Sequence, residues 1–129
     1  MTYGNFYKYR LNKYDDNLRE KILTICTSYY NVNYQDLIYF NRDLLVKLRS
    51  IYTFLCADFS PTSSRKSIAK TLGLKSHEQI SVRFRNRNKI MSKPGYEHDF
   101  NEIRDILRFV MTFDQISTYV SNTRISRIN

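Results

Sequence analysis

Residues 64–91 read SRKSIAKTLGLKSHEQISVRFRNRNKIM, and the interpretation of the whole chain depends on this stretch. It begins with the pattern of a short helix, in which Ile68 and Leu72 face inward. Gly73 suits the left-handed conformation that ends a helix, and Ser76 is a residue type that begins one. A longer helix with polar and basic outward positions follows. The pattern predicts a helix-turn-helix at about residues 64–91.

The same part of the chain carries nearly all of the excess positive charge. The chain has 21 Lys and Arg against 12 Asp and Glu, a formal net charge of +9. Residues 41–95 hold twelve of the basic and three of the acidic side chains, so both flanks are near neutral. Clustered cations favour a polyanion and indicate a nucleic-acid site. Charge alone is also consistent with a solvated face or a site for an acidic protein.

The rest of the sequence favours helices. Three Gly and two Pro are few for short strands and turns, and apolar residues recur at helical spacing. We therefore predict an all-α fold of five or six helices without a strand. Besides the helix-turn-helix, the predicted helices begin at Asn17, Asn33, about Arg42 and about Phe100.

Each predicted helix has an apolar side for the core. These stripes comprise Leu18, Ile22, Ile25, Cys26 and Tyr29; Leu37, Ile38 and Phe40; Leu44, Leu48, Ile51, Tyr52, Leu55 and Phe59; Ile80, Phe84 and Met91; and Ile103, Ile106, Leu107, Val110 and Phe113. The two cysteines, Cys26 and Cys56, lie on apolar sides without a CxxC partner. We expect them to be buried hydrophobic residues of a cytosolic protein.

A chain of 129 residues predicts one domain. We expect an aromatic and basic N-terminal arm at residues 1–16, a helical DNA-binding domain at residues 17–120 and a polar tail at residues 121–129. No run approaches the roughly 18 apolar residues of a membrane span, and the N-terminus lacks the apolar stretch of a signal peptide. We therefore expect no membrane partner and a cytoplasmic, nucleoid-associated location.

Residue chemistry suggests roles within the helix-turn-helix. A helix fits the major groove, where Arg donates twice to guanine and Gln pairs with adenine, so Gln79 and Arg83 are predicted to read bases. Arg85 is predicted to bind phosphate. The first helix and the turn add further basic residues where phosphates would lie: Arg65, Lys66, Lys70 and Lys75.

From about residue 18 to residue 90, the sequence also resembles the C-terminal DNA-binding domain, domain IV, of the bacterial replication initiator DnaA. Residues 25–37 (ICTSYYNVNYQDL) are similar to the family's opening helix and its Asp-Leu pair. Residues 48–55 (LRSIYTFL) are similar to its Ala-Arg-Gln-Ile-Ala-Met-Tyr-Leu stretch. Residues 68–73 (IAKTLG) stand at its Ile-Gly-x-x-Phe-Gly, and residues 75–80 (KSHEQI) at its signature Arg-Asp-His-Thr-Thr-Val.

The resemblance implies a helical domain of the DnaA domain IV or Trp repressor type, whose helix-turn-helix enters a major groove. It places Lys75 at the basic turn position and His77 at the signature His, both expected to contact phosphate. It places Glu78 and Gln79 at the two base-facing Thr positions. It further implies phosphate contacts for Arg42, in the loop beside the minor groove, and for Arg49, in the long helix.

The chain departs from the family pattern at several of these positions. Ser76 replaces the signature Asp, the Thr pair is absent, and Arg87 stands where the family has an apolar residue. Because Glu78 can accept from cytosine but repels phosphate, we expect a changed target sequence. Three glycines cannot supply a phosphate-binding loop, so the initiator's ATPase chemistry is not expected.

Signals for catalysis are weak. The two histidines, His77 and His98, have no evident catalytic partners, and His98 is expected in a loop. Its neighbours Glu97 and Asp99 need a distant partner to hold a metal. We therefore predict no enzyme activity, no metal and no cofactor.

The leading hypothesis is a double-stranded DNA-binding protein with an accessory or regulatory role in replication, transposition or transcription. The alternative is a protein-interaction or assembly module on the same scaffold, which binds a partner or self-associates through the Tyr-rich arm or the last helix. Eleven Tyr favour this alternative, because Tyr is enriched at interfaces. A third hypothesis is single-stranded nucleic-acid binding through residues 1–14.

Overall fold

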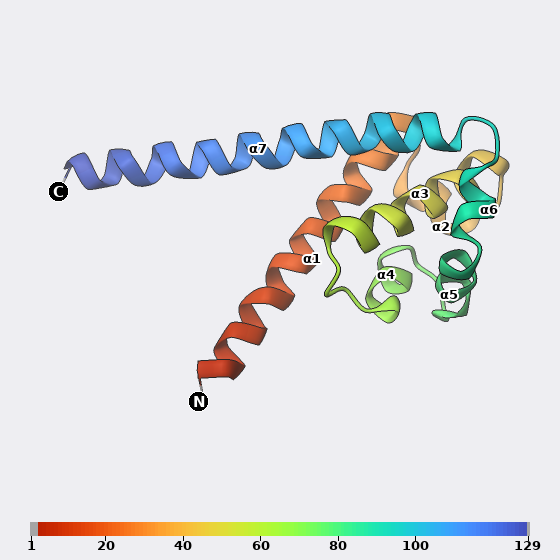
Figure 1. The fold of residues 1–129 in the computed structure, drawn as a ribbon, viewed down its shortest axis with the longest axis horizontal. Coiled ribbons are helices and arrows are strands. Elements are labelled where there is room, and N and C mark those ends of the chain that lie inside the picture. Colours follow the sequence, from red (N-terminus) through yellow and green to blue (C-terminus); the bar gives the residue numbers. More distant parts are fainter. Residues whose placement is uncertain (1–2, 129) are drawn as a thin grey trace.

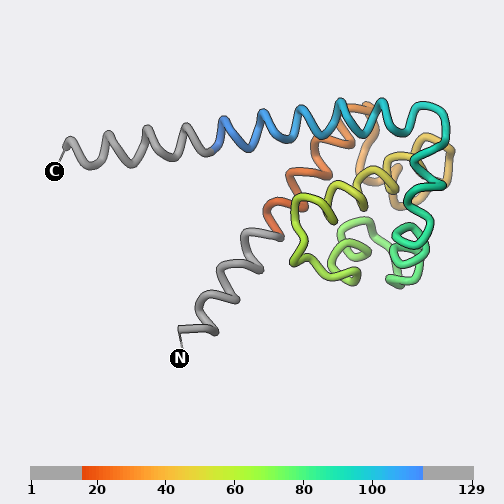
Figure 2. Tube along the Cα trace, in the orientation of Figure 1, coloured from red at the N-terminus to blue at the C-terminus, as the bar shows by residue number. Residues whose placement is uncertain are grey.

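The computed structural model describes secondary structure for residues 3–128 and side chains for residues 16–114 (Figure 2). This part of the chain contains seven helices and no strand, which confirms the predicted all-α class. The helices are α1 (Tyr3–Tyr30), α2 (Tyr34–Tyr39), α3 (Asp43–Phe59), α4 (Arg65–Thr71), α5 (Glu78–Arg85), α6 (Arg87–Met91) and α7 (Tyr96–Ile128).

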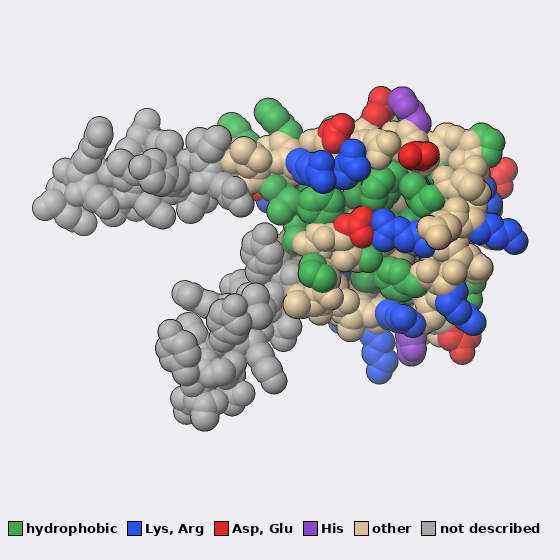
Figure 3. Space-filling view, viewed as in Figure 1, with side chains coloured by type: hydrophobic (Ala, Val, Ile, Leu, Met, Phe, Trp, Pro, Cys, Tyr) green, Lys and Arg blue, Asp and Glu red, His purple; other side chains and the backbone are tan. Residues whose placement is uncertain are grey.

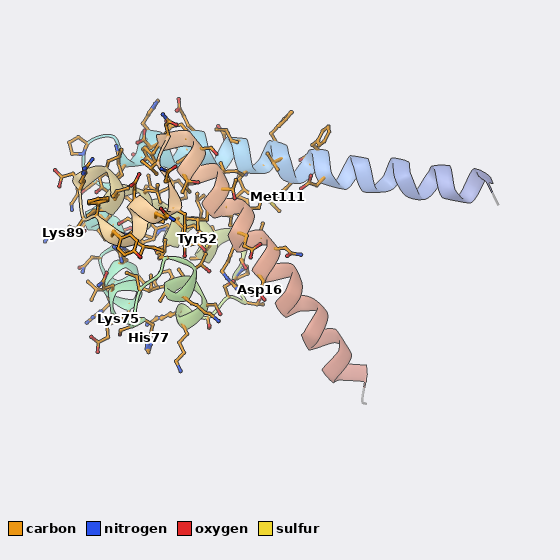
Figure 4. All side chains as sticks on the ribbon, turned by 180° about the vertical axis from the view of Figure 1, so that it is seen from behind. Asp16, Tyr52, Lys75, His77, Lys89 and Met111 are labelled. Atoms are coloured by element: carbon orange, nitrogen blue, oxygen red, sulfur yellow. The ribbon has the colours of Figure 1, made fainter. Side chains whose placement is uncertain are left out.

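Helix α3 forms the centre of the body. All of its residues from 48 to 56 are buried, and α1, α5 and α7 pack against it. Tyr52 lies in the middle of this core (Figure 4). Helices α4 and α5 lie at the end of the body opposite α7 (Figure 1).

Local signals in the sequence explain several helix ends, including the predicted start of α2 at Asn33. Asn31 takes the left-handed conformation, with φ of 54°, and ends α1. Asn33 begins α2, and its backbone N–H lies 3.4 Å from the Asp36 carboxylate. Ser60, before Pro61, ends α3 and donates its N–H to the Cys56 carbonyl at 2.8 Å.

The limits of the first and last helices differ from the prediction. Asn17 lies within α1 rather than at its start. Helix α7 begins at Tyr96, four residues before the predicted start at Phe100. The predicted arm (residues 1–16) and tail (residues 121–129) fall, apart from residue 16, outside the described side chains, so their roles stay predictions.

The predicted second helix of the helix-turn-helix divides into two. Asn86, with φ of −105° and ψ of 18°, separates α5 from α6. Its side-chain amide donates to the Val82 carbonyl at 3.1 Å. Asn competes with helix hydrogen bonds through such local bonds, which explains the break.

Three of the predicted core stripes are partly wrong. Leu37 of α2 is buried, but Ile38 and Phe40 are exposed. Leu45, not Leu44, faces the core at the start of α3. On α7, Ile103 and Leu107 are buried, but Ile106 and Phe113 are exposed. Helix α7 packs on α1, α3 and α6 from the edge of the body, so only one of its sides is covered. None of the described helices is both long and apolar enough to cross a membrane.

Gly73 makes the turn between α4 and α5. Its φ is 72°, its N–H donates to the Lys70 carbonyl, and the Leu74 N–H donates to the Ala69 carbonyl. These two bonds are the Schellman arrangement that satisfies the last carbonyls of a helix. A Cβ at Gly73 would lie 2.8 Å from Cγ1 of Ile38. The turn therefore requires glycine both for its backbone conformation and for its contact with α2.

Gly73→Ala should lower the free energy of unfolding by about 2 kcal/mol, because alanine is strained at positive φ and Ile38 must move. Urea unfolding followed by circular dichroism measures this loss. Gly95→Ala is the matched control: its φ is 84°, but its Cβ would meet only Lys47 Nζ at 3.7 Å. The control should lose about half as much. Equal losses would contradict the role of the Ile38 contact.

Candidate nucleic-acid interface

Helices α4 and α5 form a hairpin fixed by both its turn and its buried side. Ser64 caps α4 by accepting from the Ser67 N–H at 3.1 Å. At the start of α5, the Glu78 N–H donates to Ser76 Oγ, also at 3.1 Å. Ile68 and Ile80 are buried beneath the hairpin. The hairpin therefore presents its outer side in a defined orientation.

The outward face of α5 lies opposite the buried Ile80. Because a helix repeats every 3.6 residues, Glu78, Val82 and Arg85 share this face. All three are exposed, and Val82 exposes 44% of its surface. Gln79 is also exposed, on the side of α5 towards α3. Two of the three predicted base readers, Glu78 and Gln79, are thus accessible.

The third predicted base reader, Arg83, turns towards the body. Its Nε donates to Ser50 Oγ at 3.3 Å, and its Nη1 lies 3.4 Å from the Gln79 carbonyl. Burial lowers the pKa of Arg83, and the positive charge of Arg49 lowers it further. The guanidinium lines a shallow hollow of about 390 Å³ between α3, α5, α6 and the start of α7. Arg83 therefore connects α5 to α3 through its hydrogen bond to Ser50.

The structure also gives Arg49 a different place from the one that the resemblance implies. Its side chain is buried, with 7% of its surface exposed. The guanidinium donates to the carbonyls of Leu37 and Phe40 and to Oδ1 of Asn41, at the end of α2. Burial lowers the pKa of Arg49. These bonds occupy the groups that a phosphate contact would need, so we reassign Arg49 to a structural role.

Two further predicted phosphate ligands, Arg42 and Arg65, are exposed but in contact with aromatic rings. Arg65 donates to Ser81 Oγ at 2.9 Å and lies 5.4 Å from the Phe84 ring centroid, so it joins α4 to α5. Arg42 lies 5.1 Å over the Phe40 ring, before α3 and outside the hairpin. Only Arg65 belongs to the α4–α5 surface.

The hairpin carries cations without counter-charges. Segment 64–91 holds eight Lys and Arg and one acidic residue, Glu78. Six of these cations are exposed and make no ion pair among residues 16–114. Arg65 donates to Ser81, and Lys89 lies on α6; we call the other four the hairpin cations: Lys66, Lys70, Lys75 and Arg85. Lys75 projects beside the exposed His77 at the end of the body away from α7 (Figure 4), where basic side chains gather (Figure 3).

Four of the eight Lys and Arg in the rest of residues 16–114 have acidic partners. Lys21 pairs with Asp114, and Lys47 lies 2.9 Å from Asp99. Within segment 64–91 only Arg87 makes an ion pair, so most of the uncompensated positive charge among residues 16–114 lies in that segment.

Arg87, at the start of α6, is a structural arginine. Its two terminal nitrogens donate to the two Asp58 oxygens at 2.9 and 2.8 Å. Its guanidinium lies 5.0 Å from the Phe54 ring centroid and 5.9 Å from that of Phe100. The planar guanidinium of Arg87 thus packs on aromatic rings while it binds a carboxylate.

A polar cluster around Asp99 holds α7 against α1 and α3, and no pattern in the sequence predicts it. The Tyr30 hydroxyl donates to the Asp99 carboxylate at 2.6 Å, and the Tyr29 hydroxyl donates at 3.3 Å. Lys47 completes the cluster. Burial alone would raise the pKa of Asp99, but the bonds from Tyr30 and Lys47 and the charge of Lys47 hold it below its usual value.

The predicted loop at His98 is wrong, because His98 and Asp99 lie in the first turn of α7. His98 Nε2 lies 3.2 Å from the Glu102 carboxylate. The described side chains contain no group of three or more residues placed to hold a metal.

Asp99→Asn should lower the free energy of unfolding at pH 7 by about 2 kcal/mol, because Lys47 loses its counter-charge. Because the pKa of Asp99 is lower in the folded chain than in the unfolded chain, the charged carboxylate stabilises the fold at pH values above the unfolded pKa. This stabilisation is lost as the pH falls through the folded pKa. The wild type should therefore weaken below about pH 4, and the variant should weaken less. Urea titrations between pH 2 and 7 measure both effects. Asp105→Asn is the control, because that carboxylate is exposed. A similar loss in the control would contradict the prediction.

Cys26 and Cys56 are free and buried, which confirms the predicted burial of both. Burial raises the pKa of both thiols, that of Cys56 to about 12. Thiols with such values are poor nucleophiles at neutral pH.

Comparisons with known proteins leave the resemblance to DnaA domain IV as a prediction. Family models, curated proteins and solved structures were compared with this chain, and none of them matches it.

Proposed function

We propose that the chain is a double-stranded DNA-binding protein that inserts the α4–α5 hairpin into a major groove. The observation that carries this proposal is the set of hairpin cations, which are exposed and uncompensated beside the exposed face of α5. A duplex supplies the matching negative charge, and releasing its counterions favours binding. We further propose a nucleoid-associated role in replication, transposition or transcription, in line with the resemblance to DnaA domain IV.

The geometry favours a revised division of roles within the hairpin. Glu78, Gln79 and Arg85 lie on the accessible sides of α5, so they are the proposed base contacts. Lys66, Lys70 and Lys75, with Arg65 and His77, are the proposed phosphate contacts. Arg83 holds α5 against α3, and Arg49 holds the end of α2 against α3.

The test is a selection of bound duplexes from a random pool with the full chain at about 150 mM salt, close to the physiological range. We expect an enriched motif of about four base pairs, because α5 is short. Single-stranded DNA of the selected sequence should compete poorly. A chain that enriches no motif, or that prefers the single strand, would overturn the proposal.

The proposed roles predict different effects at two positions. Gln79→Ala should remove about 1–3 kcal/mol of discrimination at one base pair, because it deletes a base contact. Lys75→Ala should weaken all duplexes alike and reduce the salt slope by about 1. Titrations of the selected duplex and a scrambled one measure both effects. Equal effects of both variants on the two duplexes would contradict the division of roles.

A further inference from the structure

Helix α7 has a second apolar side that covers nothing in the described structure. Phe100, Ile103 and Leu107 of α7 are buried against the body. By contrast, Ile106, Phe109 and Phe113 expose 42%, 71% and 60% of their surfaces. Hydrophobic side chains stand out along the outer edge of α7 in Figure 3. We call Ile106, Phe109 and Phe113 the α7 stripe.

The spacing of the α7 stripe is that of a helix–helix seam. Its members are separated by three and then four residues. In the sequence, the same alternation continues at Ile116 and Val120, whose side chains lie outside the described part. Apolar residues at alternating intervals of three and four bring the same side of a helix repeatedly against a neighbouring helix. This spacing of three and four residues is kept over five apolar positions of the sequence, which favours a helix–helix contact over a chance arrangement.

The exposed area limits what can cover the stripe. Its three side chains expose about 350 Å² together. A standard interface needs about 800 Å² from each partner, so a contact confined to these residues is too small. An occupant must therefore run along α7, which has 33 residues and a length of about 50 Å. A helix with the same repeat meets this requirement.

We propose that two copies of this chain associate through α7. A second copy supplies a helix with the same register, and a two-fold axis lets each stripe cover the other. The closed pair leaves both hairpins free, because α4 and α5 lie at the end of the body opposite α7 (Figure 1). This self-association does not depend on DNA binding, and its test contains no DNA.

Sedimentation equilibrium of the full chain tests the proposal at concentrations from about 1 to 500 µM, a range that brackets weak protein–protein association. We expect the mass to rise from the 15.5 kDa of one chain to twice that value and stop there. The double variant Phe109→Glu/Phe113→Glu should remain a monomer throughout, because it places charges in the seam. Phe109→Leu/Phe113→Leu should still dimerise, since leucine preserves an apolar seam.

Tyr39→Glu is the matched control, because Tyr39 is also apolar and exposes 79% of its surface, but it lies on α2. This variant should dimerise like the wild type. Circular dichroism at about 1 µM, where all chains are expected to be monomeric, should give equal helix content and thermal midpoints for all variants, because the replaced side chains are exposed. A wild type that stays monomeric, a mass that rises beyond two copies, or a dimer that survives the Phe109→Glu/Phe113→Glu change would each overturn the proposal.

Discussion

Arg49→Ala is expected to lower the free energy of unfolding by about 4 kcal/mol, the largest stability loss that we predict for one exchange. The change removes the donors to the Leu37 and Phe40 carbonyls and to the Asn41 side chain. The end of α2 would keep its buried acceptors without these partners, and a cavity would remain beside α3. Urea unfolding at neutral pH measures the loss.

Arg49→Lys separates a structural role from a phosphate contact. Lysine keeps the positive charge but lacks the planar fork that reaches several acceptors, so about half of the stability loss should remain. The folded lysine variant should bind duplex DNA as tightly as the wild type, because the buried group does not touch DNA. Our assignment of Arg49 fails if the variant is fully stable yet binds DNA weakly.

The second large effect concerns the hairpin cations. Exchanging Lys66, Lys70 and Lys75 together for glutamine should weaken duplex binding by about 100-fold at 150 mM salt. Each lost phosphate contact also removes about 0.9 from the slope of log affinity against log salt, so the slope should fall by about 3. Fluorescence anisotropy over a series of salt concentrations measures both quantities.

The control for this triple change removes the same charge elsewhere. Lys21, Arg104 and Arg108 lie on α1 and α7, away from the hairpin. Their joint exchange for glutamine should weaken binding only a few-fold, through the loss of long-range attraction. Comparable losses in the two triple variants would show that net charge, rather than the hairpin, determines binding.

Features of the fold that depend on neighbours in the sequence could be predicted. The turn at Gly73, the cap at Asn33 and the end of α3 before Pro61 each depend on residues a few places apart. The start of α1 could not be found in this way. Asn17 carries the signature of a cap, but it is equally compatible with a position inside a longer helix.

Features that depend on packing could not be predicted. Whether Arg49 faces solvent or the end of α2 depends on carbonyls 9 and 12 residues away in the chain. Similarly, Arg83 donates a hydrogen bond to Ser50, which is 33 residues away in the chain. On α7, periodicity identifies apolar residues but not which of two sides meets the body, so the pattern alone predicts burial of Ile106 and Phe113, which are exposed. The exposed part of the candidate site was easier to predict, because lysines with no nearby acids remain at the surface.

The break at Asn86 limits how much sequence one hairpin can specify. Helix α5 has eight residues, so it is about 12 Å long. Because base pairs are about 3.4 Å apart, one α5 in a groove reaches about four of them. A given sequence of four base pairs occurs by chance about once in 256 positions, whereas a genome offers millions of competing sites. A single hairpin thus contacts too few base pairs to select one genomic site. Selective binding requires two such sites to be bound together.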